Sequence, residues 1–314
     1  MVKALGRTGL SIGPLVVGGN VFGWTIDEKR SFEVLDAFFA GGATMIDTAD
    51  VYYAYAPGNV GGESETIIGR WMKERGNRDR VQVATKVGLL EVGGAKGLQP
   101  AVIEAAVEAS LRRLGTDYVD LYFAHSDDES VPQEEYLDAF DALVRSGKVR
   151  AIAASNFTAD RLRSALEISR RDGLAEFVAL QPHYNLVERA DFETSLAPLL
   201  ESEGLSCLPY YGLAKGFLTG KYRDGGPEVD SPRAEGARAY LDDRGRAVLA
   251  VLDEIAAGHG VPVAAVALGW LTAQPTVAAP IASARNTDQL AGLLPVLDLE
   301  LTDDEVRLLS HVSA

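Results

Sequence analysis

Short apolar runs alternate with helical patterns along most of the chain. Each run is rich in β-branched residues and apolar on both faces, which is typical of parallel strands that are covered on both sides. Eight such runs occur: LVVGG (15–19), ATMID (43–47), VQVATK (81–86), VDLYFAH (119–125), VRAIAAS (149–155), FVALQPH (177–183), LSCLPYY (205–211) and TVAAPIAS (276–283). The pattern therefore predicts eight parallel strands.

Helical patterns fill the intervals between these runs. Residues 28–42 end in a Gly-Gly pair, and residues 99–115 have a proline in the first turn and end at a glycine. These are ordinary start and stop signals of helices. Residues 134–148, 159–173 and 190–204 repeat the arrangement, so we expect helices there as well.

The spacing of the runs predicts the fold. Successive runs begin 28 to 38 residues apart, before a last step of 71 residues. One strand and one helix per step, repeated eight times, predicts an α/β fold closed into a (β/α)₈ TIM barrel. A doubly wound open sheet is the alternative, but the chain has no GxGxxG after the first run, where such a sheet often carries it.

Two segments do not belong to this repeat. Residues 2–13 have glycines at turn positions, which predicts an N-terminal β-hairpin closing the barrel floor. The extra length of the last step lies in residues 222–240, which are polar and rich in Gly and Pro. A loop of this length is usually functional or mobile. The chain has no linker or low-complexity tract, so we expect a single domain over residues 1–314.

Composition narrows the class of protein. The chain is 47% hydrophobic and has a net charge of −15, which argues against nucleic acid or an anionic membrane as its main partner. We find no apolar run of about 18 or more residues, so no membrane span is expected. The start of the sequence has no long apolar stretch of the kind found in a signal peptide. The single cysteine, Cys207, fits a reducing compartment, and we expect a cytoplasmic protein.

Polar side chains at the ends of the predicted strands supply the candidate chemistry. Asp47, Lys86 and His125 each close an apolar run, and Tyr52 follows five residues after Asp47. Barrel enzymes build their sites at the carboxyl ends of the strands, so these four side chains can converge. We expect the Lys86 ammonium to stay charged beside Asp47 and to lower the pKa of Tyr52. Tyr52 would then be a general acid for a carbonyl oxygen that His125 orients by a hydrogen bond.

Each of these residues has an ordinary structural explanation when it is taken alone. Tyr52 lies in an aromatic cluster and a lone histidine at a strand end is often structural, whereas a lysine in an apolar strand is rarely buried without a partner. The four together favour a catalytic site.

Several ordered motifs resemble those of the aldo-keto reductase family from about Leu5 to Leu309. They are GRTGLSIGPLVVGG, IDTADVYY, GESETIIG (62–69), ATK, DLYFAH, GKVRAIAASNF (147–157), LQPHYNL (180–186), GFLTGKY (216–222) and IASARNTDQL (281–290). The resemblance implies a (β/α)₈ barrel that reduces carbonyls with a nicotinamide cofactor, NADPH. It also implies that Asp47, Tyr52, Lys86 and His125 form the catalytic tetrad, with Tyr52 as the proton donor, and no metal is expected.

The resemblance also implies the cofactor contacts. The carboxamide of the nicotinamide would meet Ser155, Asn156 and Gln181, its ring would stack on Tyr210, and the adenosine 2′-phosphate would meet Ser283 and Arg285. The remaining implied contacts come from the loop that would cover the pyrophosphate, the adenine end, and the strand ends at the ribose and nicotinamide: Gly212, Leu213, Lys215, Gly216, Lys221, Gln289, Gly19, Asn20 and Asp47. The chain departs from the family where Tyr211-Gly212 replaces Ser-Pro, where Leu293 replaces Asn, and where Ser126-Asp127-Asp128 follows His125.

Four aromatic residues lie in loops that we expect to surround the substrate: Trp24, Tyr53, Tyr55 and Tyr211. They predict a small-molecule carbonyl substrate that is aromatic or flat and apolar. The leading function is NADPH-dependent reduction of an aldehyde or ketone by a monomer or weak homo-oligomer. Two alternatives remain open: a regulatory NAD(P)-binding protein of the potassium-channel β-subunit kind, and an alcohol dehydrogenase that works in the oxidative direction with NAD.

Overall fold

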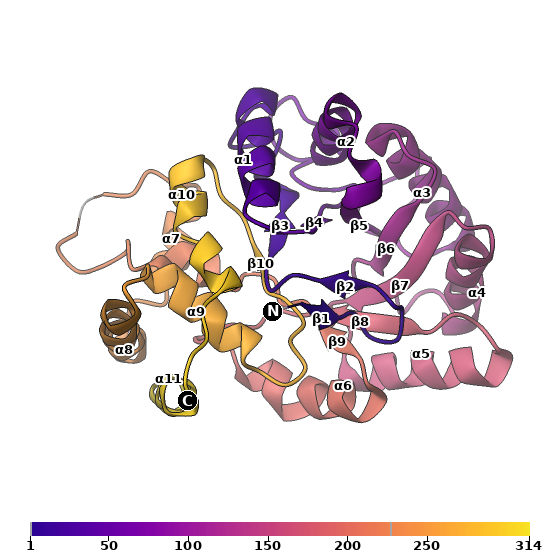
Figure 1. The fold of residues 1–314 in the computed structure, drawn as a ribbon. Coiled ribbons are helices and arrows are strands. Elements are labelled where there is room, and N and C mark those ends of the chain that lie inside the picture. Colours follow the sequence, from indigo (N-terminus) through magenta and orange to yellow (C-terminus); the bar gives the residue numbers. More distant parts are fainter. Residues whose placement is uncertain (1, 227) are drawn as a thin grey trace.

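Eight parallel strands form one curled sheet in the computed structural model, which describes residues 2–226 and 228–314 (Figure 1). Their bounds are β3 (Val16–Gly18), β4 (Met45–Asp47), β5 (Gln82–Val87), β6 (Val119–Ala124), β7 (Val149–Ser155), β8 (Phe177–Gln181), β9 (Ser206–Cys207) and β10 (Ile281–Ala282). Neighbours in the sheet follow the order β10-β3-β4-β5-β6-β7-β8-β9. Every predicted run overlaps one of these strands, and β5 extends one residue beyond its run, to Val87.

The sheet closes on itself through the residues that precede β10. The amide of Cys207 in β9 donates to the carbonyl of Thr276 at 2.8 Å, and the amide of Ala278 donates to the carbonyl of Cys207 at 2.9 Å. On the other side, the amide of Val16 in β3 donates to the carbonyl of Pro280 at 3.0 Å. The same segment therefore pairs with both ends of the sheet, and the predicted (β/α)₈ barrel is confirmed.

Helices surround the strands, with α1 to α5 following one another around the outside (Figure 1). The helices are α1 (Glu28–Ala40), α2 (Glu63–Arg75), α3 (Pro100–Leu114), α4 (Gln133–Arg145), α5 (Ala159–Asp172), α6 (Ala197–Glu203), α7 (Ala234–Arg238), α8 (Asp243–His259), α9 (Val263–Thr272), α10 (Thr287–Ala291) and α11 (Asp303–Val312). Short turns are η1 (Gly19–Val21), η2 (Arg78–Arg80), η3 (Phe192–Leu196), η4 (Ala214–Thr219) and η5 (Leu294–Leu297).

Helix α5 illustrates why these segments are helical. The side chain of Thr158 caps its start by accepting a hydrogen bond from the amide of Arg161, and Gly173 ends it in the left-handed conformation at φ 70°. Its buried residues recur every three or four positions, so one face packs on the barrel: Ala159, Leu162, Ala165, Leu166 and Ser169.

The N-terminal hairpin closes the floor of the barrel, as predicted. Strands β1 (Lys3–Ala4) and β2 (Ser11–Ile12) pair antiparallel, and Figure 1 shows them lying across the barrel. Leu5 and Ile12 are fully buried in the cluster that fills the barrel interior, where they meet small and apolar strand residues such as Ala84, Leu121 and Ala153. The functional cleft must therefore open at the other end.

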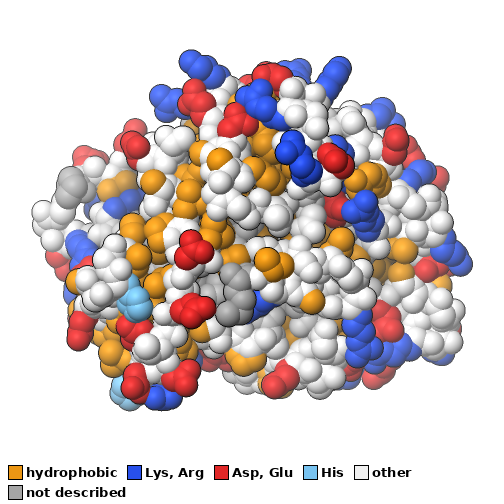
Figure 2. Space-filling view, in the orientation of Figure 1, with side chains coloured by type: hydrophobic (Ala, Val, Ile, Leu, Met, Phe, Trp, Pro, Cys, Tyr) orange, Lys and Arg blue, Asp and Glu red, His pale blue; other side chains and the backbone are white. Residues whose placement is uncertain are grey.

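The surface at the floor carries charges of both signs. The space-filling view from this side shows Lys and Arg interspersed with Asp and Glu, many of them around the edge of the molecule (Figure 2). Within the described residues, no single helix is long and apolar enough to cross a membrane. Only α8 and α9 taken together pass that test, and they are bent by 97°.

Two local predictions differ from the structure. The helix expected over residues 190–204 contains the π-helical turn η3 ahead of α6, because Pro198 has no amide hydrogen to continue the regular ladder. We expect a loop throughout residues 222–240 from the sequence, but the segment contains the short helix α7.

Helix α9 was not predicted. It has no helical periodicity in the sequence, because eight of its ten residues are buried.

Candidate active site

A cleft of about 590 Å³ opens at the carboxyl ends of the strands. Asp47 is the last residue of β4, Ser155 of β7 and Gln181 of β8, while His125 directly follows β6. Most of the residues singled out from the sequence line this cleft: Asn20, Trp24, Asp47, Tyr52, His125, Ser155, Asn156, Gln181, Tyr210, Tyr211, Leu213, Lys215, Gly216, Lys221, Ser283, Arg285 and Gln289. Strand order thus brings residues more than 200 positions apart to one place.

The Lys86 ammonium organises the deepest part of the cleft. Its side chain is fully buried, and Nζ lies 2.7 and 2.8 Å from the two carboxylate oxygens of Asp47 and 2.7 Å from the carbonyl of Thr48. The Tyr52 hydroxyl lies 2.7 Å from Nζ and donates to Asp47 Oδ2 at 2.7 Å. The Gln181 amide also donates to Asp47 Oδ1, at 2.8 Å. A charged lysine, a carboxylate and a phenol are therefore in direct mutual contact.

The pKa of Tyr52 differs from the expectation. Burial, followed by the charge and hydrogen bond of Asp47, raises the pKa of Tyr52 well above its ordinary value, so the expected lowering by Lys86 is wrong for this structure. Burial also lowers the pKa of Lys86, although Asp47 opposes that shift. The phenol therefore keeps its proton at neutral pH. It can still donate to an oxygen that gains alkoxide character, because such an oxygen is more basic than a phenolate.

His125 stands edge-on to Tyr52 at the same depth. The two ring centroids are 6.1 Å apart at an interplanar angle of 77°, and the ring nitrogen Nδ1 is buried with no hydrogen-bond partner among the described residues. Burial and the charge of Lys86 lower the pKa of His125 well below its usual range. The imidazole is therefore neutral and can donate one hydrogen bond to a neutral ligand oxygen.

Polar amides and hydroxyls continue the cleft on the far side of Asp47. The Asn156 amide donates to the carbonyl of His125 at 2.9 Å, and its oxygen accepts from the Tyr210 hydroxyl at 2.9 Å. Ser155 donates to the carbonyl of Gln181 at 2.8 Å. Gln181 in turn touches Asp47, so this set of groups is fixed relative to the tetrad.

Left-handed backbone is concentrated at the cleft. Among the described residues, the non-glycine positions with positive φ are Tyr53, Asn156, Tyr211, Ala214 and Lys215. All of them line the cleft or adjoin a residue that does. Such conformations are costly for residues with a β-carbon and tend to occur at functional sites, where they fix the direction of a side chain.

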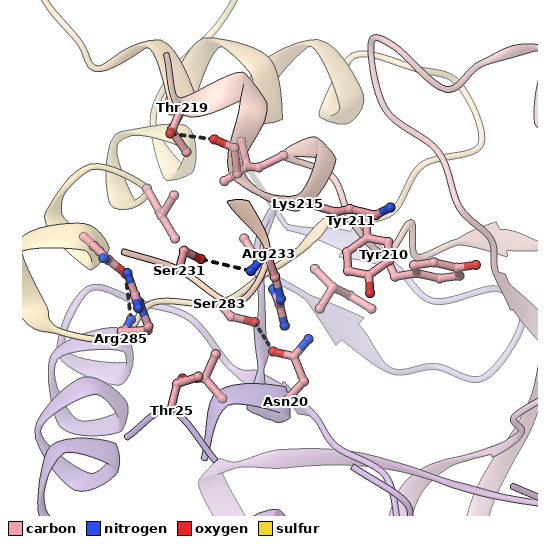
Figure 3. Close-up of a pocket in the computed structure, with 18 of the residues that line it drawn as sticks. Asn20, Thr25, Tyr210, Tyr211, Lys215, Thr219, Ser231, Arg233, Ser283 and Arg285 are labelled. Carbon is pink, nitrogen blue, oxygen red and sulfur yellow. Dashed lines mark hydrogen bonds between the residues drawn. The ribbon is translucent and has the colours of Figure 1, made fainter. Parts of the chain in front are cut away.

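Four cations line the cleft without a carboxylate partner. Lys215, Lys221, Arg233 and Arg285 form no salt bridge within residues 2–226 and 228–314, although the whole chain has a net charge of −15. Burial lowers the pKa of Lys221, and the nearby charges of Arg285 and Arg233 lower it further. Figure 3 shows Arg285 and Tyr210 at opposite ends of the pocket, with Arg233 between them. Cations held together without carboxylates are suited to an anionic ligand.

The aromatic residues divide into two groups. Trp24 lines the cleft with its ring stacked on Tyr53 at 3.4 Å, and Tyr211 lines it from the other side. Arg233 lies over Trp24 and Tyr211 at 5.6 and 5.8 Å and donates to the Tyr53 hydroxyl at 3.1 Å. Tyr53 and Tyr55 do not line the cleft, contrary to the expectation. Tyr53 supports the lining residue Trp24 by stacking on it, whereas Tyr55 is 79% exposed.

Two expected cofactor residues also lie outside the cleft. A β-carbon on Gly19 would meet Ser64 Oγ at 2.9 Å and the Asp47 carbonyl at 3.1 Å, so this glycine permits a close approach of backbone. Gly212 packs against Leu268 and Leu271 of α9. Neither glycine lines the cleft.

Sequence reasoning missed several lining residues. Thr25, Thr219, Ser231, Pro232 and Arg233 all contribute to the cleft. Arg233 belongs to the segment 222–240, whose length pointed to a functional loop without identifying a residue. The polar stretch after His125 has a structural explanation: Asp127 pairs with Arg161 at 2.5 Å, and Asp128 accepts from the amide of Leu98 at 2.9 Å.

Comparison with known proteins identifies the family. The sequence model described as "Aldo/keto reductase family" matches residues 14–314. The chain belongs to the aldo/keto reductase family. Family membership supports oxidoreductase activity on carbonyl groups, and the family generally uses NAD(P)H.

Curated relatives of this aldo-keto reductase carry different names. Norsolorinic acid reductase B of Aspergillus parasiticus is 32% identical over 96% of this chain and 81% of its own length. A probable voltage-gated potassium channel subunit beta of Oryza sativa subsp. japonica is 33% identical, over 95% and 91%. Aryl-alcohol dehydrogenase [NADP(+)] of Phanerodontia chrysosporium is 30% identical, over 96% and 83%. Relatives of this chain thus include proteins named as enzymes and a protein named as a channel subunit.

Proposed function

We propose that this aldo-keto reductase reduces an aldehyde or ketone to the alcohol with NADPH, and that Tyr52 is the general acid. The observation that carries the proposal is the contact of Tyr52, Lys86 and Asp47 at the bottom of a cleft lined by unpaired cations. When bound, NADPH supplies the hydride that the carbonyl carbon accepts. The chain must supply the proton, the orientation of the two reactants, and the counter-charges for the phosphates.

The four residues of the proposed tetrad explain how the carbonyl oxygen gains its proton. His125, as a neutral donor, holds the carbonyl oxygen beside the Tyr52 hydroxyl, and that oxygen takes the phenolic proton as it gains negative charge. The phenolate left behind lies 2.7 Å from the Lys86 ammonium, which stabilises it. Asp47 keeps the ammonium in place through both of its oxygens. The product alcohol has then gained one hydride and one proton.

The residues of the cleft fit NADPH. Its pyrophosphate and 2′-phosphate carry about four negative charges in total, and the cleft is lined by four cations that form no salt bridge with any described residue. Asn156, Ser155 and Gln181 offer amide and hydroxyl groups to a carboxamide beside Tyr210. Arg285 stands at the end of the cleft away from Tyr210, and Ser283 lies between them with its hydroxyl donating to Asn20 Oδ1 at 2.8 Å (Figure 3). A guanidinium at that end suits a phosphate that NADPH carries and NADH lacks.

The walls of the cleft favour an aromatic substrate. Trp24 and Tyr211 line the same cleft as Tyr52, and one relative is named an aryl-alcohol dehydrogenase. We therefore expect p-nitrobenzaldehyde to be reduced with a higher kcat/KM than glyceraldehyde, in a panel of aldehydes and ketones assayed with NADPH and with NADH. Trp24→Ala should narrow the difference in kcat/KM between the two aldehydes. Tyr55→Ala, at an exposed position outside the cleft, should leave that difference unchanged. A higher value for glyceraldehyde in the wild type would contradict this substrate class.

A regulatory role on the same fold is the second candidate, and the channel-subunit relative favours it. A protein of that kind would bind NADPH tightly and reduce every member of the panel slowly. An oxidative dehydrogenase would instead show its highest kcat/KM with alcohols and NAD. The same panel therefore separates the three functions.

A further inference from the structure

Asp50 is a buried carboxyl that the proposed reaction does not use. It stands between Asp47 and Tyr52 in the sequence, yet it does not line the cleft. Its side chain is 0% exposed, and neither carboxylate oxygen has a side-chain hydrogen-bond partner within the described residues. Its backbone is held in place, because the amide of Gly62 donates to its carbonyl at 2.7 Å and its own amide donates to the carbonyl of Lys86 at 3.5 Å.

Four titratable or charged groups face Asp50 from the elements packed around it. Glu65 comes from α2, Lys86 from β5, Arg113 from α3 and Tyr122 from β6. Glu65 is fully buried and accepts hydrogen bonds at 2.6 Å from both the Thr85 hydroxyl and Arg113 Nε. The Tyr122 hydroxyl is buried and, within the described residues, has no partner.

Charge pairing leaves Asp50 as the surplus acid. Lys86 is paired with Asp47, and Arg113 is paired with Glu65. Among the described residues, an ionised Asp50 would be a third buried carboxylate with no cation of its own and no side-chain donor, and the neighbouring backbone amide of Val51 would offset only part of that cost. Burial, followed by the charge of Glu65, raises the pKa of Asp50 to about 8. Both the geometry and the pKa therefore describe an uncharged carboxyl at neutral pH.

We propose that Asp50 is a positioning residue of the active site, which is held uncharged behind Lys86 and whose ionisation slows proton transfer from Tyr52. The proposal rests on the proposed function of the tetrad. When Tyr52 gives up its proton, it becomes a phenolate, and the positive charge of Lys86 must stabilise that phenolate. A second carboxylate behind Lys86 would offset part of that positive charge and make the phenol a weaker acid.

The sign of the pH dependence follows from this arrangement. Below about pH 8 Asp50 is protonated and the tetrad has the charge of a single carboxylate and a single ammonium. Above about pH 8, the negative charge of the ionised Asp50 raises the pKa of Tyr52 further. The wild-type kcat for carbonyl reduction should therefore fall roughly three- to thirtyfold as the pH rises through this range.

The test compares Asp50→Asn with wild type in a pH profile of kcat at saturating NADPH. Asparagine keeps the shape of the neutral carboxyl and cannot ionise, so its profile should stay level where the wild-type rate falls. Glu104→Gln removes an exposed carboxylate from α3 and should show the wild-type fall. The same alkaline fall in Asp50→Asn and in wild type would overturn the proposal.

Infrared spectroscopy gives a readout that does not depend on turnover. The carbonyl stretch of a protonated carboxyl should be present in wild type at about pH 6, absent in Asp50→Asn, and lost from wild type as the pH passes about 8. Labelling the aspartate side chains with carbon-13 distinguishes this band from that of a glutamate, even if the variant does not fold. No such band at about pH 6 would overturn the proposal, whereas a wild type with this band and no turnover would contradict the proposed function alone.

Discussion

Tyr52→Phe should lower kcat for carbonyl reduction by roughly 10²–10⁴-fold while NADPH still binds. The substitution removes only a hydroxyl that touches Asp47 and Lys86, and the phenyl ring keeps its packing against His125. Without the hydroxyl, the oxygen that gains charge during hydride transfer has no acid within reach. Fluorescence titration with NADPH measures binding, and absorbance of the reduced nicotinamide follows turnover.

Lys86→Met should do comparable damage for a different reason. It removes the charge that stabilises the phenolate and leaves Asp47 buried without its cation, which costs about 3–5 kcal/mol of stability. Turnover is therefore measured at a temperature where circular dichroism shows the variant to be folded. Because the two residues act as one unit, the double variant should lose little more than either single one.

A matched control tests whether removing a phenol hydroxyl elsewhere in the protein also lowers kcat. Tyr118→Phe removes a phenol from the residue directly before β6, at the opposite end of this strand from the cleft, and should leave kcat unchanged. A Tyr52→Phe protein that binds NADPH and reduces its best substrate at near the wild-type rate would remove Tyr52 from the mechanism.

Arg285→Ala should weaken NADPH binding about ten- to a hundredfold and leave NADH binding nearly unchanged. The reason is the loss of a charged hydrogen-bonding partner of the 2′-phosphate, which contributes about 1.5–3 kcal/mol. The side chain of Arg285 has no carboxylate partner within the described residues, so its removal breaks no salt bridge there. Dissociation constants for both cofactors, measured by fluorescence titration, give the comparison.

Arg307→Ala is the matched control, because it removes an exposed arginine from α11 that pairs only with Asp304 among the described residues. It should alter neither dissociation constant. Equal losses for NADPH and NADH in Arg285→Ala would show that Arg285 reads another part of the cofactor or supports the fold.

The strands could be predicted from local patterns, and the convergence of Lys86 and Asp47 from the order of the strands. A run such as VQVATK must be buried, and a lysine at its end needs a buried partner, which the strand order places at Asp47. Side-chain direction in the loops has no such rule. Tyr53 has a left-handed backbone at φ 53°, which an aromatic residue rarely adopts, and Tyr55 beyond it points to solvent.

Long-range contacts account for the other residues that were missed. Arg233 reaches the Tyr53 hydroxyl across 180 positions in the sequence, from a polar segment with no periodicity. The raised pKa of Tyr52 depends on its burial and on the charge and hydrogen bond of Asp47, and burial of a loop residue cannot be read from its neighbours in the chain. The tertiary structure supplies this information.

The central claim is that the cleft transfers a hydride from NADPH to a carbonyl carbon while Tyr52 supplies the proton. The most direct test uses NADPH that carries deuterium at the C4 position from which hydride is transferred, with p-nitrobenzaldehyde as substrate and mass spectrometry of the alcohol. Preparations labelled on either face of the nicotinamide are compared. We expect one deuterium in the product alcohol from one of the two preparations, and roughly 10²–10⁴-fold less product from Tyr52→Phe in the same time. Bound NADPH with no deuterium in any product from either preparation would contradict the account.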